Sequence, residues 1–324
     1  MPLEQPQARI SLNGQYVYGL IELDIQSCSA FLAGRFCIKF AVGFSLSIDE
    51  FMSFQGSFVS IEIADNSFSY SEVMTGYVEN ISFDLLENTA ALQGRDLTSI
   101  LIDANLNQSF VNQSASDIAI TIAQQYGMTA NICDTSSLVG QYYQIDHTKI
   151  GLNSGSRTGT AWDLLCKIAV LQDCTVFVTN NILNFVKVDL DIKAYLGPSN
   201  FMNLNVDLLG SLPGSVNVKS WNSREKSVVE QSIGSGQTLK IIQPNLTLDK
   251  AQKYASSYMN LIQQHQRTIT GKMPGDTNLK TMSAVMVDGT GSSLDGSYLI
   301  DSLRRRMNSR EGFVQFMKAS ALNS

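Results

Sequence analysis

Few residues in this chain have the types and spacing that acid–base or metal chemistry requires. The only two histidines, His147 and His265, lie in unrelated surroundings. Asp189 and Asp191 are two positions apart and would share one face of a strand, as carboxylates do in some calcium sites and glycoside hydrolases. Two carboxylates alone do not make such a site. The sequence therefore predicts no catalytic, metal-binding or cofactor-binding residue.

Motifs for nucleophilic catalysis and phosphate binding are also absent from the sequence. No serine lies between glycines in the G-x-S-x-G spacing of a nucleophile elbow. The segments Gly234-Ser235-Gly236 and Gly289-Thr290-Gly291 lack the Gly-Lys-Ser/Thr or third glycine that a phosphate-binding loop needs. We interpret both segments as turns.

Five cysteines are present, an odd number, and no two form a C-x-x-C pair. This pattern predicts neither a disulfide framework nor a zinc site. Small buried hydrophobic residues with reduced thiols are the simplest interpretation. The five are Cys28, Cys37, Cys133, Cys166 and Cys174.

The most concentrated charge is the run Arg304-Arg305-Arg306, followed by Arg310. One interpretation is a solvated turn at the end of a strand. The other is a contact with an acidic neighbouring subunit, because planar guanidinium groups pair well with carboxylates. No aromatic residues that could stack on bases are interleaved with the arginines, which disfavours nucleic-acid binding.

Composition favours a β-rich protein that packs against other proteins. The 324 residues are 44% hydrophobic and only 16% charged, and the net charge is −6 with a pI near 5.0. An acidic chain has no global field to hold a polyanion, although it would let DNA pass without binding. The start of the sequence lacks a signal-peptide pattern, and no apolar run approaches the roughly 20 residues of a membrane helix. We expect synthesis and folding in the cytoplasm.

Residues 1–95 show the alternation of β-strands. Large side chains at Phe36, Ile38, Phe40, Val42 and Phe44 alternate with smaller or polar ones, which only a strand places on one face. Leu23 and Ile25 alternate with Glu22 and Asp24 in the same way. Several strands joined by short polar turns predict an antiparallel β-barrel or β-sandwich.

Residues 96–192 are predicted to form a small α/β domain. Asp96 is a suitable N-cap for a short helix after Gly94, and Ser114 begins a capping box. Thr160 and Asp163 repeat that device before a helix that contains Trp162. A hairpin is expected around Asn180-Asn181, and both Trp162 and Trp221 are predicted core residues.

Residues 193–324 are predicted to form a second β-barrel into which a long helix, about 248–265, is inserted. The strand Val216–Trp221 alternates apolar and polar residues, and further strands begin at Gly296 and Gly312. The fold class is thus mixed β and α+β, with two tube-like barrels and an α/β domain between them. The two β regions are of similar size and suggest a loose duplication.

The order of these segments resembles the phage tail baseplate hub family, which includes late-control D proteins, the Mu-like baseplate hub and the N-terminal region of VgrG spike proteins. The likeness covers nearly the whole chain. The motifs that carry it include residues Gly94, Asp96, Thr160, Trp162, Asp163, Trp221, Gly296, Tyr298 and Gly312.

The resemblance implies a structural baseplate hub without catalytic activity. It implies a homotrimeric ring that adapts a six-fold tail tube to a three-fold central spike and leaves a channel for DNA in transit. The implied partners are the tube and spike proteins, with tape-measure and baseplate wedge proteins as further candidates. No lysozyme-like segment or C-terminal β-helix is added, so the spike is expected to be a separate chain. The implied place is the virion tail, assembled in the host cytoplasm.

One departure concerns the last hairpin, where family members often carry a histidine and this chain has Arg304 to Arg306. That difference puts the detail of the terminal hairpin in doubt, not the architecture. Two alternatives stay open. The first is the hub of a phage-derived contractile injection system or pyocin. The second is a cell-wall hydrolase or glycan-binding β module, which would need a carboxylate pair in a cleft.

Overall fold

A computed structural model describes most of the chain, and 49% of the residues that it describes lie in strands and others in five α-helices. His147 and His265 lie outside the described residues. The described residues are 7–64, 69–106, 108, 110–136, 138–143, 148–150, 159–210, 212–222, 225–264 and 266–322. Among the helices in these ranges, none is both long enough and apolar enough to cross a bilayer.

The N-terminal β region is a curved antiparallel array with one short helix, α1 (Ile48–Met52). Alternation along β4 buries Phe36, Ile38 and Phe40 as the sequence predicts. The strand stops at Ala41, and Phe44 is 72% exposed, because Gly43 adopts a positive φ that turns the chain. The strands are β1 (Ala8–Leu12), β2 (Gln15–Val17), β3 (Leu20–Cys28), β4 (Arg35–Ala41), β5 (Phe58–Ala64), β6 (Tyr70–Asp84) and β7 (Thr89–Asp96).

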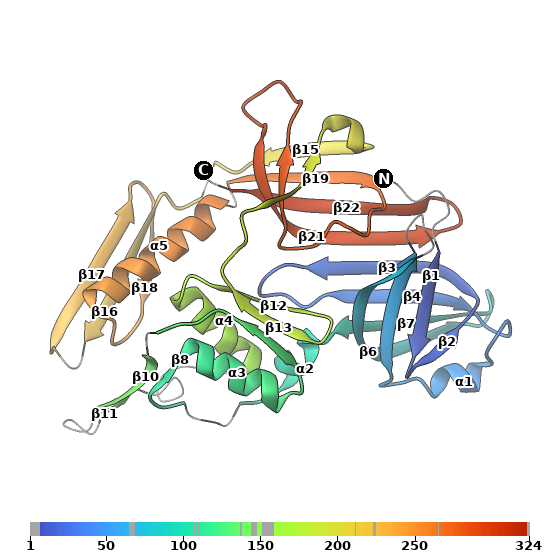
Figure 1. Cartoon of the computed structure of the whole chain (residues 1–324), viewed down its shortest axis with the longest axis horizontal. Helices are drawn as coiled ribbons and strands as arrows, with labels where there is room; N and C mark the ends of the chain where they lie inside the picture. The colour runs from blue at the N-terminus through green and yellow to red at the C-terminus, as the bar shows by residue number, and fades with distance from the viewer. Residues whose placement is uncertain are drawn as a thin grey trace.

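The C-terminal β region continues the same sheet. Antiparallel pairing of β21 with β3 joins the two regions into one sheet of thirteen strands, which Figure 1 shows running across the molecule. The main order is β15-β19-β22-β21-β3-β4-β7-β6-β5-β1-β2, and β20 and β14 branch from β21. The added strands are β14 (Ile192–Leu196), β15 (Asn203–Leu208), β19 (Arg267–Pro274), β20 (Ala284–Val287), β21 (Gly296–Asn308) and β22 (Gly312–Ala321).

The strand pairing confirms the mixed β and α+β class but not the finer architecture. Within the described ranges the sheet has free ends and closes into no barrel. The two tube-like barrels therefore stay a prediction, as does the division into 1–95, 96–192 and 193–324.

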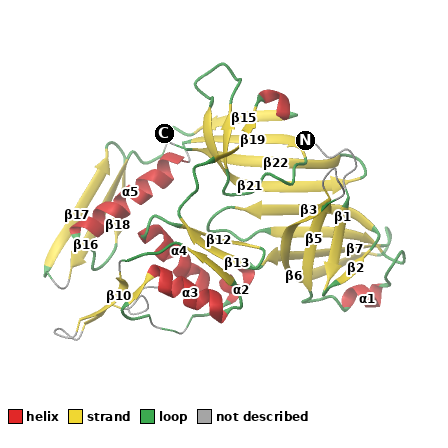
Figure 2. Ribbon diagram, in the orientation of Figure 1, coloured by secondary structure: helices red, strands yellow, loops and turns green. Residues whose placement is uncertain are grey.

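A small α/β unit packs below the large sheet in the view of Figure 2. Ser114 forms the expected capping box with Asp117 at the start of α3, and Asn180, with φ of 50°, turns the hairpin of β12 and β13. The unit has its own core of buried residues. Its elements are α2 (Thr98–Asp103), β8 (Gln113–Ser114), α3 (Ala115–Gln125), β9 (Thr129–Ile132), β10 (Leu138–Tyr143), β11 (Thr148–Ile150), α4 (Ala161–Leu171), β12 (Thr175–Thr179) and β13 (Ile182–Val186).

The long helix α5 (Leu248–Gln264) lies between β15 and β19 in the chain, as an inserted helix should, but it does not pack on the large sheet. It covers a separate three-stranded sheet of β16 (Ser215–Asn222), β17 (Ser227–Gly234) and β18 (Thr238–Ile242). Val216 and Val218 pack there against Ala251 and Tyr254. The strand Val216–Trp221, which the sequence assigned to the second barrel, therefore contributes to a separate hydrophobic core. Its apolar face packs against α5 and not against the large sheet.

The five cysteines are free thiols, and Cys174 is the buried one. The Sγ atoms of Cys133 and Cys174 lie 3.2 Å apart at one edge of the α/β unit. Burial raises the pKa of Cys174 to about 12, so its thiol keeps its proton at neutral pH.

Candidate functional site at the seam between the β regions

Gly94 and Asp96 lie where β7 leaves the large sheet for α2. A Cβ at Gly94 would lie 1.9 Å from the carbonyl oxygen of Tyr77 and 2.6 Å from the ring of Phe36, so only glycine fits. The N-cap of α2 is Leu97, so the prediction of Asp96 as the N-cap is wrong by one position. Asp96 Oδ1 nevertheless accepts a hydrogen bond from the Thr98 amide at 3.0 Å.

The Asp96 carboxylate also links two segments of chain. Its Oδ2 accepts from the Gly34 amide at 2.6 Å, so it holds the β3–β4 loop against the start of α2. Burial is the main cause that raises the pKa of Asp96 to about 6, although these hydrogen bonds oppose the rise. The motif therefore fixes the junction between the large sheet and the α/β unit.

Thr160, Trp162 and Asp163 form the start of α4, far in sequence from that junction. Thr160 Oγ1 accepts from the Asp163 amide at 3.1 Å, as predicted. Trp162 is buried, and its Nε1 donates to the carbonyl of Phe31 at 3.3 Å. The tryptophan thus ties the α/β unit to the β3–β4 loop, and its core assignment is correct.

The other predicted motif residues lie in the C-terminal half. Trp221 is 55% exposed near the end of β16, so its assignment to the core is wrong: alternation along β16 buries Ser220 and Asn222 instead. Tyr298 is fully buried in β21 and its hydroxyl donates to Leu294 at 2.7 Å. Gly296 begins β21, and Gly312, with φ of 68°, begins β22.

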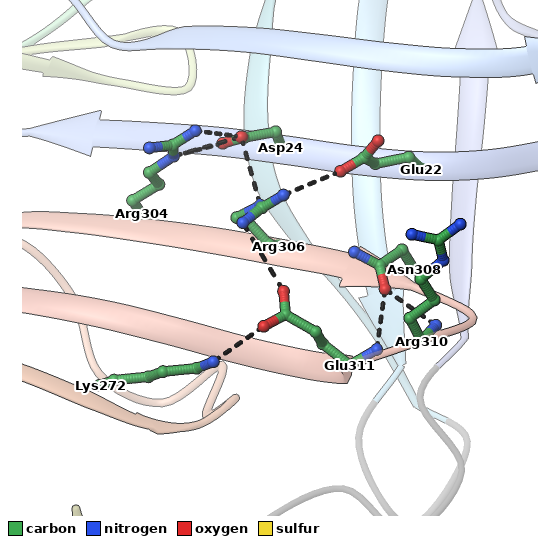
Figure 3. A network of polar contacts seen from close by, with 8 residues as sticks. All are labelled: Glu22, Asp24, Lys272, Arg304, Arg306, Asn308, Arg310 and Glu311. Carbon is green, nitrogen blue, oxygen red and sulfur yellow. Dashed lines mark hydrogen bonds and ion pairs between the residues drawn. The ribbon is translucent and has the colours of Figure 1, made fainter. Parts of the chain in front are cut away.

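The arginine run lies inside β21, not in a turn, and Figure 3 shows where its side chains go. Arg304 Nε donates to Asp24 Oδ1 at 2.9 Å, and its Nη2 donates to Asp24 Oδ2 at 2.5 Å. Paired guanidinium and carboxylate groups of this kind are the stronger type of charged hydrogen bond. The two residues are 280 positions apart and face each other across the pairing of β21 with β3.

Arg306 extends this charged contact along the same face. Its Nη2 lies 3.2 Å from Glu22 Oε1 and its Nε lies 3.6 Å from Asp24 Oδ2. Its Nη1 lies 3.6 Å from Glu311, which also pairs with Lys272 at 2.9 Å. We call these residues, together with Arg304, the charged seam. They align the two β regions within one chain.

Arg305 points to the opposite face of the sheet and is only 4% exposed. Its Nη2 donates to the carbonyl oxygens of Leu279 at 2.5 Å and Asp276 at 3.5 Å. Burial lowers the pKa of Arg305 to about 10, so the guanidinium remains charged at neutral pH. It fastens the segment before β20 to the back of the sheet.

Arg310 lies exposed in the turn between β21 and β22, where its amide donates to Asn308 Oδ1 at 3.0 Å. Its side chain points away from the charged seam in Figure 3. A subunit contact by the arginines remains a prediction, and Arg310 is the member whose position leaves it most accessible.

Two shallow cavities flank Arg304 on the outer face of the sheet. One of about 440 Å³ extends over β3, β4, β7 and β6 and is lined by Asp24, Arg35 and Gly94. The other, of about 320 Å³, extends over β15, β19 and β22 and is lined by Asn205, Thr270 and Lys318. Gly94 and Arg304 thus line the same cavity, the one of about 440 Å³.

The arrangement offers shape and charge for binding, and no acid–base pair converges on either cavity wall that the structure describes. Asp189 and Asp191 both pair with Lys193, at 2.8 and 3.8 Å, at the surface. Across the described ranges, no three His, Cys, Asp or Glu side chains group as metal ligands would.

Sequence reasoning missed that the arginines bind Glu22 and Asp24. The sequence did contain a signal for this contact. Glu22 and Asp24 are two acidic residues two positions apart, and Arg304 and Arg306 are two basic residues with the same spacing. On two strands such pairs can face each other. Nothing in the sequence, however, fixes which of many strands become neighbours.

No protein-family model matches the chain, and no curated protein matches it. Solved structures do. The chain is similar to a tail protein from Neisseria meningitidis MC58, with a TM-score of 0.78, 14% identity, and coverage of 98% of this chain and 96% of that one. It is similar to a 43 kDa tail protein of prophage MuSo2 from Shewanella oneidensis, with a TM-score of 0.75, 16% identity, and coverage of 97% and 98%.

An Escherichia coli protein, described as a component of the type VI secretion system with structural similarity to T4 bacteriophage tail proteins, is also similar. Its TM-score is 0.63 at 10% identity, with coverage of 97% of this chain and 77% of that one. At these identities the likeness is one of fold. The fold is that of the phage tail and spike-related proteins that the sequence resemblance named.

Proposed function

We propose that the chain is a structural baseplate hub protein of a phage tail. Three copies would form a ring that adapts the six-fold tail tube to the three-fold central spike and leaves a channel for DNA. The observation that carries the proposal is the fold, which matches two tail proteins over 96% and 98% of their lengths. A matching length means that the whole architecture, and not one domain, is shared.

The two joined β regions suit this role physically. Each chain contributes two regions to one sheet, so three chains contribute six, which suits a six-fold tube on one side and a three-fold spike on the other. A closed ring follows from cyclic symmetry and also completes the edges of the sheet. The net charge of −6 suits a channel through which DNA passes without binding.

The proposed partners are further copies of the chain, the tail tube protein and the central spike protein. Tape-measure and baseplate wedge proteins are additional candidates, and DNA is a partner only in transit. The proposed place is the baseplate of the virion tail, after assembly in the host cytoplasm. The proposed role is non-enzymatic, in keeping with neighbours described as tail proteins.

A second candidate is the hub of a contractile injection system or pyocin. The likeness to the type VI secretion component favours it, because that protein too is matched over 97% of this chain. The genes that adjoin this one separate the two candidates: tail-completion and capsid genes indicate a phage, and sheath and effector genes without capsid genes indicate an injection system.

The test is to delete the gene and image the particles, with the wild-type gene supplied in trans as the control. We expect tubes that lack a tip, and a three-fold density at the tip when the gene is restored. Normal tips without the protein would contradict the proposal. Clearing of peptidoglycan by the purified chain in a zymogram would instead favour the cell-wall hydrolase or glycan-binding alternative.

A further inference from the structure

Two four-stranded modules with the same order lie side by side in the large sheet. The first module is β3-β4-β7-β6 and the second is β15-β19-β22-β21. All neighbours within both modules are antiparallel. The fourth strand of each is long and shifts register against the third, at Val78/Asn80 in β6 and at Ile300/Ser302 in β21. The second module therefore repeats the first.

The repeat assigns each residue a counterpart. When the two register shifts are superimposed, Asn80 corresponds to Ser302, and the strand pairings then fix the other strands. The apolar residues of β3, Leu23 and Ile25, fall on Leu204 and Val206 of β15, which supports the alignment. The counterparts obtained this way are Gln93 and Lys318, Gly94 and Ala319, Cys37 and Thr270, and Asp24 and Asn205.

The fourth strands differ in what they pair with. The first half of each pairs with an outer strand, β5 for β6 and β20 for β21. The second half of β21, Ser302–Asn308, pairs with β3. The second half of β6, Asn80–Asp84, has β7 on one side and no described strand on the other. The outer side of β15, the counterpart of β3, is likewise without a described strand.

Both open edges alternate apolar with polar side chains, and further apolar residues lie exposed next to them. Leu208 is 69% exposed at the end of β15 and Leu209 is exposed directly after it, while Leu85 is 70% exposed in the turn that follows β6. Ile81 and Phe83 are half-buried and alternate with exposed Ser82 and Asp84. Open backbone groups flanked by apolar side chains are a template for strand pairing with another chain.

We infer that β6 of one copy pairs through residues 80–84 with β15 of a second copy, in the register of the β21–β3 seam. The inference rests on the proposed ring and names its interface. The seam provides the template, since it joins the same two strand types within one chain. Its register places Ile81 opposite Leu208, Phe83 opposite Val206, Ser82 opposite Asp207, and Asp84 opposite Asn205.

The side chains of this contact match face by face. Ile81 and Phe83 already pack on the core of the N-terminal region, and Leu204 and Val206 on that of the C-terminal region, so pairing would merge two cores. The opposite face would bring together only Ser82, Asp84, Asn205 and Asp207, with no carboxylates directly opposed. Each copy offers two different edges, so repetition of the contact builds a ring when the rotation closes.

Cysteine cross-linking tests the register. The double variant Ser82→Cys/Asp207→Cys places thiols directly opposite each other, within the 4.5–5.5 Å typical of cross-strand pairs. The matched control Ser82→Cys/Asn203→Cys displaces one thiol by four residues, about 13 Å along the strand. After mild oxidation with oxidised glutathione, we expect covalent dimers and trimers at least about ten-fold more abundant in the first variant. Both variants are tested as the purified chain and in assembled tails.

A charge variant tests the edge independently. Leu208→Lys should shift the sedimenting species from three times 35.5 kDa to a monomer with unchanged circular dichroism. Ile242→Lys, at an 83% exposed position of β18, should leave it unchanged. A trimer that survives Leu208→Lys, or cross-links equally in the displaced control, overturns the register but not the proposed hub. A chain that is monomeric alone and never joins the tail overturns both.

Discussion

The seam inside the chain and the open edges of the same sheet use corresponding strands with different side chains. At the seam, Arg304 and Arg306 face Glu22 and Asp24. The counterparts at the open edges are Ser82 and Asp84 on β6, and Asn203 and Asn205 on β15. Ion pairs between specific charges align the two strands at the seam, whereas the contact proposed for the open edges would bury apolar residues. The comparison therefore separates an ion-paired alignment within the chain from an apolar contact proposed between copies.

The first and second modules also differ at three positions that mutation can probe. The first has Gly94, Phe83 and Asp96 where the second has Ala319, Arg305 and Ala321. Each position tests whether corresponding strands tolerate the same residue. The expected effects decrease from the glycine to the charged seam.

Gly94→Ala should cause the largest loss, more than about 3 kcal/mol in the free energy of unfolding, because the new Cβ would meet the backbone of Tyr77. Ala319→Gly, the reverse change in the second module, should cost only about 1 kcal/mol from added chain entropy. Urea unfolding of the two variants measures the difference. Equal losses would contradict the close approach of the Tyr77 backbone to Gly94.

Arg305→Ala should cost about 3 kcal/mol, because it removes a buried charged donor and leaves the Leu279 carbonyl without it. Arg310→Ala, in the exposed turn, should stay within about 0.5 kcal/mol of the parent. Thermal unfolding followed by circular dichroism checks both. A similar cost for the two arginines would contradict the burial of Arg305.

Asp96 should make the stability of the first module depend on pH, which Ala321 cannot do for the second. Its folded pKa of about 6 lies above the ordinary 3.8, so the folded state binds the proton more tightly than the unfolded state. The contribution of Asp96 to the free energy of unfolding therefore falls by about 2 kcal/mol as pH rises from about 4 to 6, and it stays level above that.

The measurement is the unfolding free energy of the parent and of Asp96→Asn between pH 4 and 7. The difference between the two curves should change over that window, since only the parent titrates there. A constant difference would show that Asp96 keeps its ordinary pKa in the folded chain.

The charged seam should contribute the smallest amount to stability, since its side chains are partly exposed. A double-mutant cycle with Asp24→Ala and Arg304→Ala should give a coupling of about 1 kcal/mol at low salt, and less at 1 M salt. Coupling that does not change with salt would indicate a contact other than an ion pair. The charged seam therefore matters more for the register of β21 against β3 than for the free energy of unfolding.

Local signals predicted much of the fold. Alternation fixed the buried face of β4, and short-range caps at Ser114 and Thr160 fixed two helix starts. These succeed because the interacting atoms are close in sequence. The prediction that Trp221 is a core residue was wrong because its strand, β16, belongs to a separate sheet. Which face of that sheet is buried depends on where α5 packs, and the sequence does not show this.

The candidate site was only half predictable. The arginine run was recognised, but its partners lie 280 positions away, and sequence alone gives no means to choose β3 as the neighbour of β21. The duplication was suspected from size. Its register emerged only from the shifts at Val78/Asn80 and Ile300/Ser302, since the residues of the two modules differ too much to align by eye.

The pairing of β3 with β21 has a consequence for biosynthesis. The partner of Leu20–Cys28 leaves the ribosome about 280 residues later, which at 5–20 residues per second is roughly 15–60 s. During that interval the N-terminal strands must wait with one side uncovered. Slow long-range closure of this kind exposes a nascent chain to aggregation. Chaperone binding to the early segment would therefore end when the last hairpin is translated.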